Sequence, residues 1–283
     1  MTHEFDPGYS QAPFSGLVGD YPGPKVYPPG DFRVEWGPVF HRGRLDGTAR
    51  VLVLGQDPAQ HETIARRILV GEAGHRIQGF LAKLGIDRHY VMINTFLYSV
   101  FGQRGGSKHR HDKKIATYRN RWLEALLSFG RIDAVVALGS LADSAWEDWK
   151  KTQPVGSLPN YVKITHPTQP ESAGGSSAAH AASIKRMLQN WNAALSLLHP
   201  LPHRDKSRPL KLYGDAFLGG DRVAIPEFDL PPGIPEWIRL DDGWADRPGT
   251  GLMKRRTITV TVPRPYVPQR PRVGLFQAAA PAS

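Results

Sequence analysis

Four short apolar runs alternate with segments of helical periodicity between residues 49 and 199. The runs occupy 49–55 (ARVLVLG), 89–96 (HYVMINTF), 133–139 (DAVVALG) and 160–167 (NYVKITHP). Near-continuous apolar runs of this length are typical of strands buried on both faces of a parallel sheet. Apolar residues recur at helical spacing in the segments 62–70, 75–85, 116–130, 140–151 and 178–198. The alternation predicts a three-layer α/β/α fold around a four-stranded, mainly parallel sheet with right-handed crossovers.

The two flanks of this region have a different composition. Residues 1–48 are rich in proline and glycine and predict an extended arm that leads into the α/β domain at 49–199. Residues 200–283 hold 13 of the 25 prolines, with one alternating strand candidate at 256–263 (RTITVTVP). We expect this C-terminal extension either to wrap around the core or to be partly disordered.

Charge and composition narrow the class of protein. The chain carries 36 Lys and Arg against 26 Asp and Glu, a net charge of +10. This charge favours a polyanionic partner, nucleic acid before an anionic membrane, although a basic and inert surface is the alternative. The absence of cysteine excludes disulfides, thiolate zinc sites and iron–sulfur clusters. With no apolar run long enough for a membrane span and no secretion signal, we expect a cytoplasmic protein.

Polar residues follow each predicted strand at its carboxyl end. Gln56 and Asp57 follow the first strand, Asn94 ends the second, Ser140 follows the third and His166 the fourth. Each of them alone fits a turn or a helix cap. Ligands of open parallel sheets, however, bind beyond the carboxyl ends of the strands, so the joint placement predicts a site.

These residues carry a resemblance to a known family. The segments GQDP at 55–58, INT at 93–95 and HPTQP at 166–170 resemble motifs of the uracil-DNA glycosylase superfamily. The stretch 68–96 is more similar to the thermophile-type branch, whereas GQDP is typical of the common branch. The resemblance extends over about residues 50–195. It implies a metal-free, monofunctional glycosylase that needs no cofactor, flips uracil out of single- or double-stranded DNA and starts base excision repair. We expect a monomer that holds the abasic product tightly.

By this resemblance, four residues act on the flipped nucleotide. The Asp57 carboxylate stabilises the cationic sugar and orients the attacking water, and a neutral His166 donates a hydrogen bond to uracil O2. Asn94 pairs with uracil O4 and N3–H, and Gln56 offers its backbone amide to the base. Departures from the family pattern affect how the base is held. Ala59 stands where the common branch has a tyrosine that excludes thymine, and Leu69 replaces a phenylalanine that stacks on uracil.

DNA contacts are expected from three segments. Thr168, Gln169 and Pro170 replace the usual serine and the leucine that wedges the duplex, and Ser140 lies at the same sheet edge. The basic loop after the second strand predicts phosphate contacts from Lys108, His109, Arg110 and His111, with a solvated charged loop as the alternative. A covalently trapping branch of the superfamily has a reactive histidine near this place, so His109 or His111 is a candidate for covalent capture.

Two other functions compete with the glycosylase. One is a protein that binds uracil or abasic DNA without turnover. The other is a different nucleotide-handling α/β hydrolase, disfavoured because no Walker-type glycine loop occurs. His61 and Glu62 suggest a zinc protease, but position 65 is alanine where a second histidine is required. We therefore expect a structural role for Glu62 and an exposed His61.

Overall fold

The computed structural model describes residues 9–101, 106–154, 156, 158–172, 175–249, 251 and 256–266. Its main sheet has the order β1-β3-β2-β4-β5. The strands are β1 (His41–Gly43), β2 (Val51–Gly55), β3 (Tyr90–Asn94), β4 (Ala134–Leu138) and β5 (Asn160–Ile164). Strands β2 to β5 are parallel, so the predicted α/β fold is confirmed. The predicted number of four strands was wrong, because β1 adds an antiparallel fifth strand beside β3. Its three residues fall in the segment assigned to the arm and are too few to show a strand pattern.

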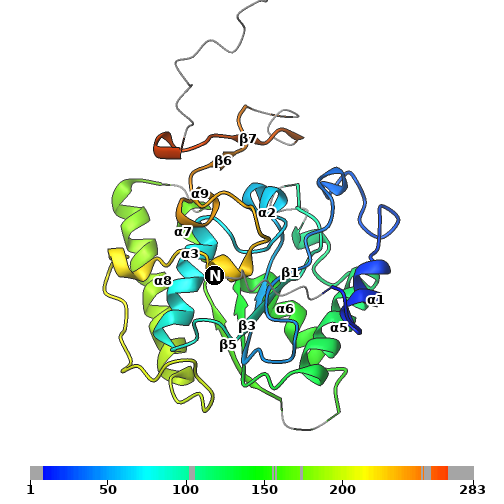
Figure 1. The fold of residues 1–283 in the computed structure, drawn as a ribbon, viewed down its shortest axis with the longest axis horizontal. Coiled ribbons are helices and arrows are strands. Elements are labelled where there is room, and N and C mark those ends of the chain that lie inside the picture. Colours follow the sequence, from blue (N-terminus) through cyan, green and yellow to red (C-terminus); the bar gives the residue numbers. More distant parts are fainter. Residues whose placement is uncertain are drawn as a thin grey trace, which may run out of the picture.

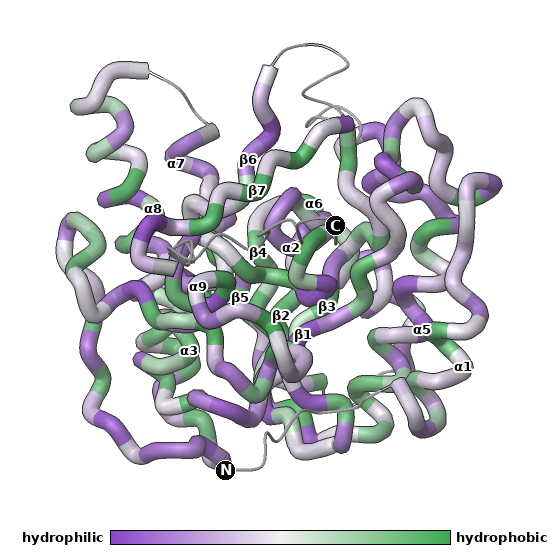
Figure 2. Tube along the Cα trace, turned by 45° about the horizontal axis from the view of Figure 1, so that its top comes forward, coloured by the Kyte–Doolittle hydropathy of each residue, from purple (hydrophilic) through white to green (hydrophobic). Residues whose placement is uncertain are grey.

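Helices cover both faces of this sheet (Figure 1). On one face lie α3 (Glu72–Lys83) and α8 (Ser177–Leu198), which pack on alternate strand residues such as Val51 and Val53. On the other face lie α5 (Lys113–Phe129) and α6 (Gly139–Lys150), packed on Leu52 and Leu54. Figure 2 shows hydrophobic segments of the central strands inside hydrophilic outer loops. Burial on both faces explains why the strands read as continuous apolar runs.

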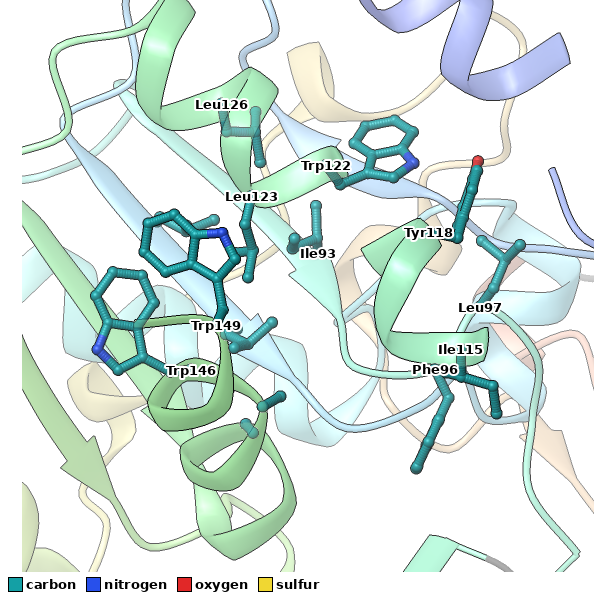
Figure 3. Packing of buried hydrophobic residues seen from close by; sticks show 14 of the residues in the cluster. Ile93, Phe96, Leu97, Ile115, Tyr118, Trp122, Leu123, Leu126, Trp146 and Trp149 are labelled. Atoms are coloured by element: carbon teal, nitrogen blue, oxygen red, sulfur yellow. The ribbon is translucent and has the colours of Figure 1, made fainter. Parts of the chain in front are cut away.

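The α5 and α6 side of the core is rich in aromatic rings (Figure 3). Trp146 stacks almost parallel on Tyr161 of β5, with ring centroids 5.5 Å apart. The N-terminal arm joins this layer, because Phe14 of α1 (Phe14–Gly19) packs on Trp122 at 5.6 Å. The short helix η1 (Val34–Trp36) follows along the arm. The described part of the arm is therefore packed against the core.

Helix α2 (Gln60–Ala65) is shorter than the helix expected at 62–70, and that expectation was wrong. Arg66 and Leu69 adopt left-handed backbone conformations, with φ of 56° and 51°, which end the helix. The Arg66 guanidinium donates to the backbone oxygens of Trp36 and Pro38. These contacts with the arm favour a turn that the apolar spacing of residues 62–70 does not reveal.

The C-terminal extension lies against the core up to a small two-stranded sheet, the second sheet of the structure. Its elements are η2 (Gly219–Asp221), η3 (Glu227–Asp229), α9 (Trp237–Leu240), β6 (Ala245–Asp246), β7 (Thr259–Val260) and η4 (Arg264–Tyr266). Strands β6 and β7 pair antiparallel, and β7 falls within the strand candidate at 256–263. Residues 267–283 lie outside the described part. No helix among the described residues is long and apolar enough to cross a membrane.

A buried carboxylate fastens this extension to the sheet. Asp229 of η3 accepts hydrogen bonds from Arg42 of β1 at 2.7 Å, from Arg44 at 3.0 Å and from the Tyr90 hydroxyl at 2.5 Å. The Asp229 and Arg42 side chains are fully buried. Removing the carboxylate would leave two buried guanidinium groups without their anionic partner, which costs about 3–5 kcal/mol.

Asp229→Asn is therefore expected to lower the free energy of unfolding by about 3–5 kcal/mol in urea titrations. The matched control is Asp215→Asn on the same extension, whose carboxylate is 73% exposed and pairs with Lys185. That change is expected to cost at most about 1 kcal/mol. Equal effects of the two substitutions would show that the buried carboxylate does not fasten the extension.

Candidate active site

A cavity of about 610 Å³ opens at the carboxyl ends of β2, β4 and β5. This is the edge at which the sequence predicts a site. The residues singled out from the sequence that line it are Gln56, Asp57, Ala59, Arg110, Ser140, His166, Thr168 and Gln169. They come from four separate segments of the chain, and the parallel sheet brings them together. The cavity has the size of a typical small-ligand site.

The other predicted site residues do not line this cavity. They are Leu69, Asn94, Lys108, His109, His111 and Pro170. The Asn94 side chain lies against Gly55, so close that a Cβ on Gly55 would meet Asn94 Oδ1 at 2.2 Å. Leu69 is buried in the core cluster on the α3 side of the sheet, and Pro170 is buried as well. In this conformation, neither Asn94 nor Leu69 faces the space around Asp57.

The histidines of the basic loop bind carboxylates. His109 is buried, with Nε2 3.0 Å from Asp31 Oδ2 and Nδ1 3.2 Å from Asp112 Oδ2. A carboxylate oxygen therefore lies at hydrogen-bond distance from each ring nitrogen, so neither nitrogen faces a substrate in this conformation. Lys108 Nζ also contacts Asp31, at 2.7 Å. The exposed His111 has its Nδ1 2.5 Å from Asp148.

Asp57 is the acid of the cavity. Its Oδ2 accepts a hydrogen bond from the Val100 backbone N–H at 3.0 Å. Burial raises the pKa of Asp57 to about 6, while the Val100 and Gln56 hydrogen bonds and the charges of Arg33 and Arg247 oppose this rise. At neutral pH the group is therefore mostly a carboxylate, held in a place where its charge is poorly hydrated. A poorly hydrated anion is well suited to stabilise a nearby positive charge.

Arg33 of the N-terminal arm supports the segment that holds Asp57. Its guanidinium donates to Ser99 Oγ at 3.0 Å and to the Val100 carbonyl at 2.5 Å. It also lies near the rings of Trp36 and Phe101, at 4.7 and 4.5 Å from their centroids. The contact with Val100 fixes the peptide next to the N–H that binds Asp57. No pattern in the sequence indicates this role, because Arg33 lies in an irregular segment.

His166 is the second central group. Burial lowers the pKa of His166 to about 4, so the imidazole is neutral at pH 7. Its Nδ1 accepts from the Thr168 backbone N–H at 3.3 Å and lies 3.2 Å from the Thr168 hydroxyl. The ring proton therefore resides on Nε2, which is free to donate to a ligand. A Cβ at Gly139, whose φ is 79°, would meet His166 Cβ at 3.2 Å, so glycine permits this close approach.

Arg76 of α3 fixes the loop after His166. It is buried and donates to the Pro167 carbonyl. The same guanidinium pairs with Glu171 of α7 (Gln169–Ser172) at 2.7 Å and with Glu72 at 2.5 Å. A charged group with three such partners holds the backbone on both sides of Thr168 in place.

Glu62 and His61 are used in the packing beside the site. Glu62 is buried and accepts from the Ala59 backbone N–H at 3.0 Å, which closes the first turn of α2. Burial raises the pKa of Glu62 to about 7. The expectation of an exposed His61 was wrong, because its ring packs edge-on against Trp244, with centroids 4.7 Å apart.

Asn190 and Arg247 are among the polar residues that line the cavity but were not predicted from the sequence. Asn190 of α8 accepts from the Thr165 backbone N–H at 2.7 Å, and Arg247 comes from the C-terminal extension. Both are far in sequence from the strand ends, so no spacing rule identifies them. No group of three His, Cys, Asp or Glu side chains suited to a metal ion occurs among the described residues.

Two comparisons with known proteins bear on this site. The family model for the uracil DNA glycosylase superfamily matches residues 42–203, which is more than half of the chain. The match includes β2 to β5, all but the first residue of β1, and both Asp57 and His166. It leaves out Arg33 and Arg247 and does not resolve a branch of the superfamily. A search of curated proteins finds no match.

The raised pKa of Asp57 makes a prediction about stability. The folded pKa of about 6 exceeds the unfolded value of about 3.9, so the stabilisation from protonated Asp57 is lost as the pH rises through 6. Asp57→Asn mimics the protonated group. The free energy of unfolding of the variant minus that of the parent, measured by urea titration, is expected to be about 1–3 kcal/mol larger at pH 8 than at pH 4. An unchanged difference between parent and variant at the two pH values contradicts this, and Asp215→Asn is the control.

Proposed function

The chain belongs to the uracil DNA glycosylase superfamily, and from this premise we propose that it excises uracil from DNA by hydrolysing the N-glycosidic bond. The observation that carries the proposal is one cavity that presents the carboxylate of Asp57 and the Nε2–H of a neutral His166. Reaction with a uracil in DNA requires the base to be flipped out of the stack. Uracil-containing DNA is the partner, and the reaction is the first step of base excision repair.

Asp57 stabilises the sugar. As the bond to uracil breaks, positive charge develops on the deoxyribose, and an ionised carboxylate below the ring lowers the energy of that state. The same carboxylate orients a water molecule for attack, a role typically worth about 10²–10⁴-fold in rate. The Val100 N–H fixes one oxygen of Asp57, so little reorganisation is needed when the charge appears.

His166 stabilises the leaving base. Negative charge gathers on uracil O2 as the bond breaks, and the Nε2–H donates to it. A neutral imidazole donates this hydrogen bond to uracil O2 without transferring its proton to the base. One preorganised donor to such a developing charge contributes about 3–4 kcal/mol. Thr168 holds the required tautomer by donating to Nδ1.

Recognition of the base depends on polar groups at the cavity wall. No Phe, Tyr or Trp occurs among the described lining residues, so none of these rings takes the place of the phenylalanine that Leu69 replaces. Ala59 presents no ring to exclude the methyl group of thymine, and we propose weaker discrimination against thymine than in the common branch. Gln56 and Asn190 offer amides to the base edge. Asn94 reads uracil only when its side chain turns away from Gly55.

The geometry supports turnover over covalent capture. His109 faces a carboxylate at each ring nitrogen, and His111 pairs with Asp148 outside the cavity. Neither imidazole is placed to attack a sugar in the cavity. Slow release of the abasic product is still part of the proposal, because Arg110 at the rim of a protein of charge +10 binds phosphates electrostatically.

The test is single-turnover release of uracil from a labelled oligonucleotide in EDTA. We expect Asp57→Asn to bind the DNA but to lose at least about 10²-fold in rate, and His166→Gln to lose about 10²–10³-fold. The control is His203→Gln, an exposed histidine that pairs with Asp133 at the opposite end of β4. Parent-like rates for both site variants would remove this cavity from the reaction. A stoichiometric adduct that resists denaturant would instead indicate capture.

The pH dependence of the parent follows from Asp57. The single-turnover rate is expected to be constant above pH 7 and to fall about tenfold per pH unit below about 6, as the carboxylate is protonated. His166 stays neutral over this range because its pKa is about 4. A rate that stays constant down to pH 4.5 would show that an ionised Asp57 is not required.

A further inference from the structure

The C-terminal extension reaches the active-site cavity through β6. This strand lies beside α2, the helix that follows the Asp57 turn, at the top of the view in Figure 1. The Ala245 N–H donates to His61 Nε2 at 3.3 Å, and Gln60 Nε2 lies 3.5 Å from the Ala245 carbonyl. The extension is thus joined to the catalytic segment only a few residues from Asp57.

Trp244 anchors the strand. Its side chain is 1% exposed, packs edge-on against Trp237 at 5.5 Å, and donates from Nε1 to the Ile238 carbonyl at 3.2 Å. On the other side, the Thr261 N–H donates to the Trp244 carbonyl at 2.8 Å. These contacts fix the backbone three residues before Arg247.

Arg247 is the residue that the anchored strand presents to the cavity. Arg247 lines the cavity, and its positive charge acts on Asp57. The other two cations of the lining have partners: Arg110 donates to Ser140 Oγ at 3.4 Å, and Lys163 pairs with Asp143 at 2.8 Å. Within the described residues, the Arg247 side chain makes no hydrogen bond or ion pair within 4 Å.

We propose that Arg247 binds a backbone phosphate of the DNA next to the flipped nucleotide. The inference rests on the proposed function, which places a deoxyribose above Asp57. Two phosphodiesters flank any such sugar, and a guanidinium binds a phosphate through two parallel hydrogen bonds. The C-terminal extension, which lies outside the family match at 42–203, then forms part of the DNA-binding surface.

The test measures DNA binding in the Asp57→Asn background, where the substrate is not consumed. Binding of a uracil-containing single strand is followed by fluorescence anisotropy at several salt concentrations. Arg247→Ala is expected to weaken binding about tenfold and to reduce the slope of log K against log salt by about 0.7, the value for one phosphate contact on a single strand. Arg247→Lys is expected to restore the slope but only part of the affinity, because a lysine cannot form the paired hydrogen bonds.

Lys206→Ala is the matched control. It removes one positive charge from the same extension, but its 62% exposed side chain pairs with Asp87, near the start of β3 at the opposite edge of the sheet. This variant is expected to keep the salt slope and affinity of its background. Urea titrations of all variants verify that they fold.

Two outcomes overturn the inference. One is an Arg247→Ala variant with unchanged affinity and slope. The other is an effect of Arg247→Ala, made in the parent, that is confined to the rate at saturating DNA and shifts its pH midpoint while binding stays unchanged. Arg247 would then act only on Asp57. Uracil release by the parent is measured in the same preparation. If the parent releases no uracil, the proposed function fails; if it does and binding is unaffected by Arg247→Ala, only the inference fails.

Discussion

A carboxylate at the end of a buried strand loses much of its hydration, and the site is organised around offsetting that loss. Burial alone raises the pKa of Asp57, and the Val100 N–H, the Gln56 side chain and the charges of Arg33 and Arg247 act against the rise. The balance leaves the group ionised at neutral pH but poorly solvated. Such a group interacts strongly with a positive charge that forms beside it, at a cost in stability.

The groups around Asp57 come from more of the chain than the matched domain. Arg33 of the N-terminal arm holds Val100, which lines the cavity, and Arg247 of the C-terminal extension lines the cavity itself. The flanks are held by buried interactions: Phe14 packs into the aromatic layer, and Asp229 binds Arg42 and Arg44 on the edge strand. The domain and its flanks therefore form one packed unit in the described part of the chain.

Periodicity was enough to predict the α/β class and the four parallel strands, because burial on both faces leaves a continuous apolar run. It missed β1, whose three residues are held by pairing with β3 and by the Arg42 contact with Asp229. It extended α2 too far, because the turn at Arg66 depends on oxygens of the distant arm.

The site residues that directly follow parallel strands were predicted, and those that come from other segments were missed. Asp57 and His166 follow parallel strands, so topology alone brings them to one edge. Asn94 also ends a strand, but which way its side chain turns depends on the packing against Gly55. Asn190 and Arg247 reach the cavity, and Arg33 reaches the segment that holds Asp57, through tertiary packing of a distant helix or of irregular segments, which the local sequence does not encode.

The central claim is that the ionised carboxylate of Asp57 drives the excision of uracil. It is tested most directly by titrating the Asp57 side-chain carbon by NMR and measuring single-turnover uracil release at the same pH values. We expect the two midpoints to coincide near pH 6. A rate whose midpoint departs from the titration of Asp57 by more than about one pH unit, or the absence of uracil release at any pH, would contradict it.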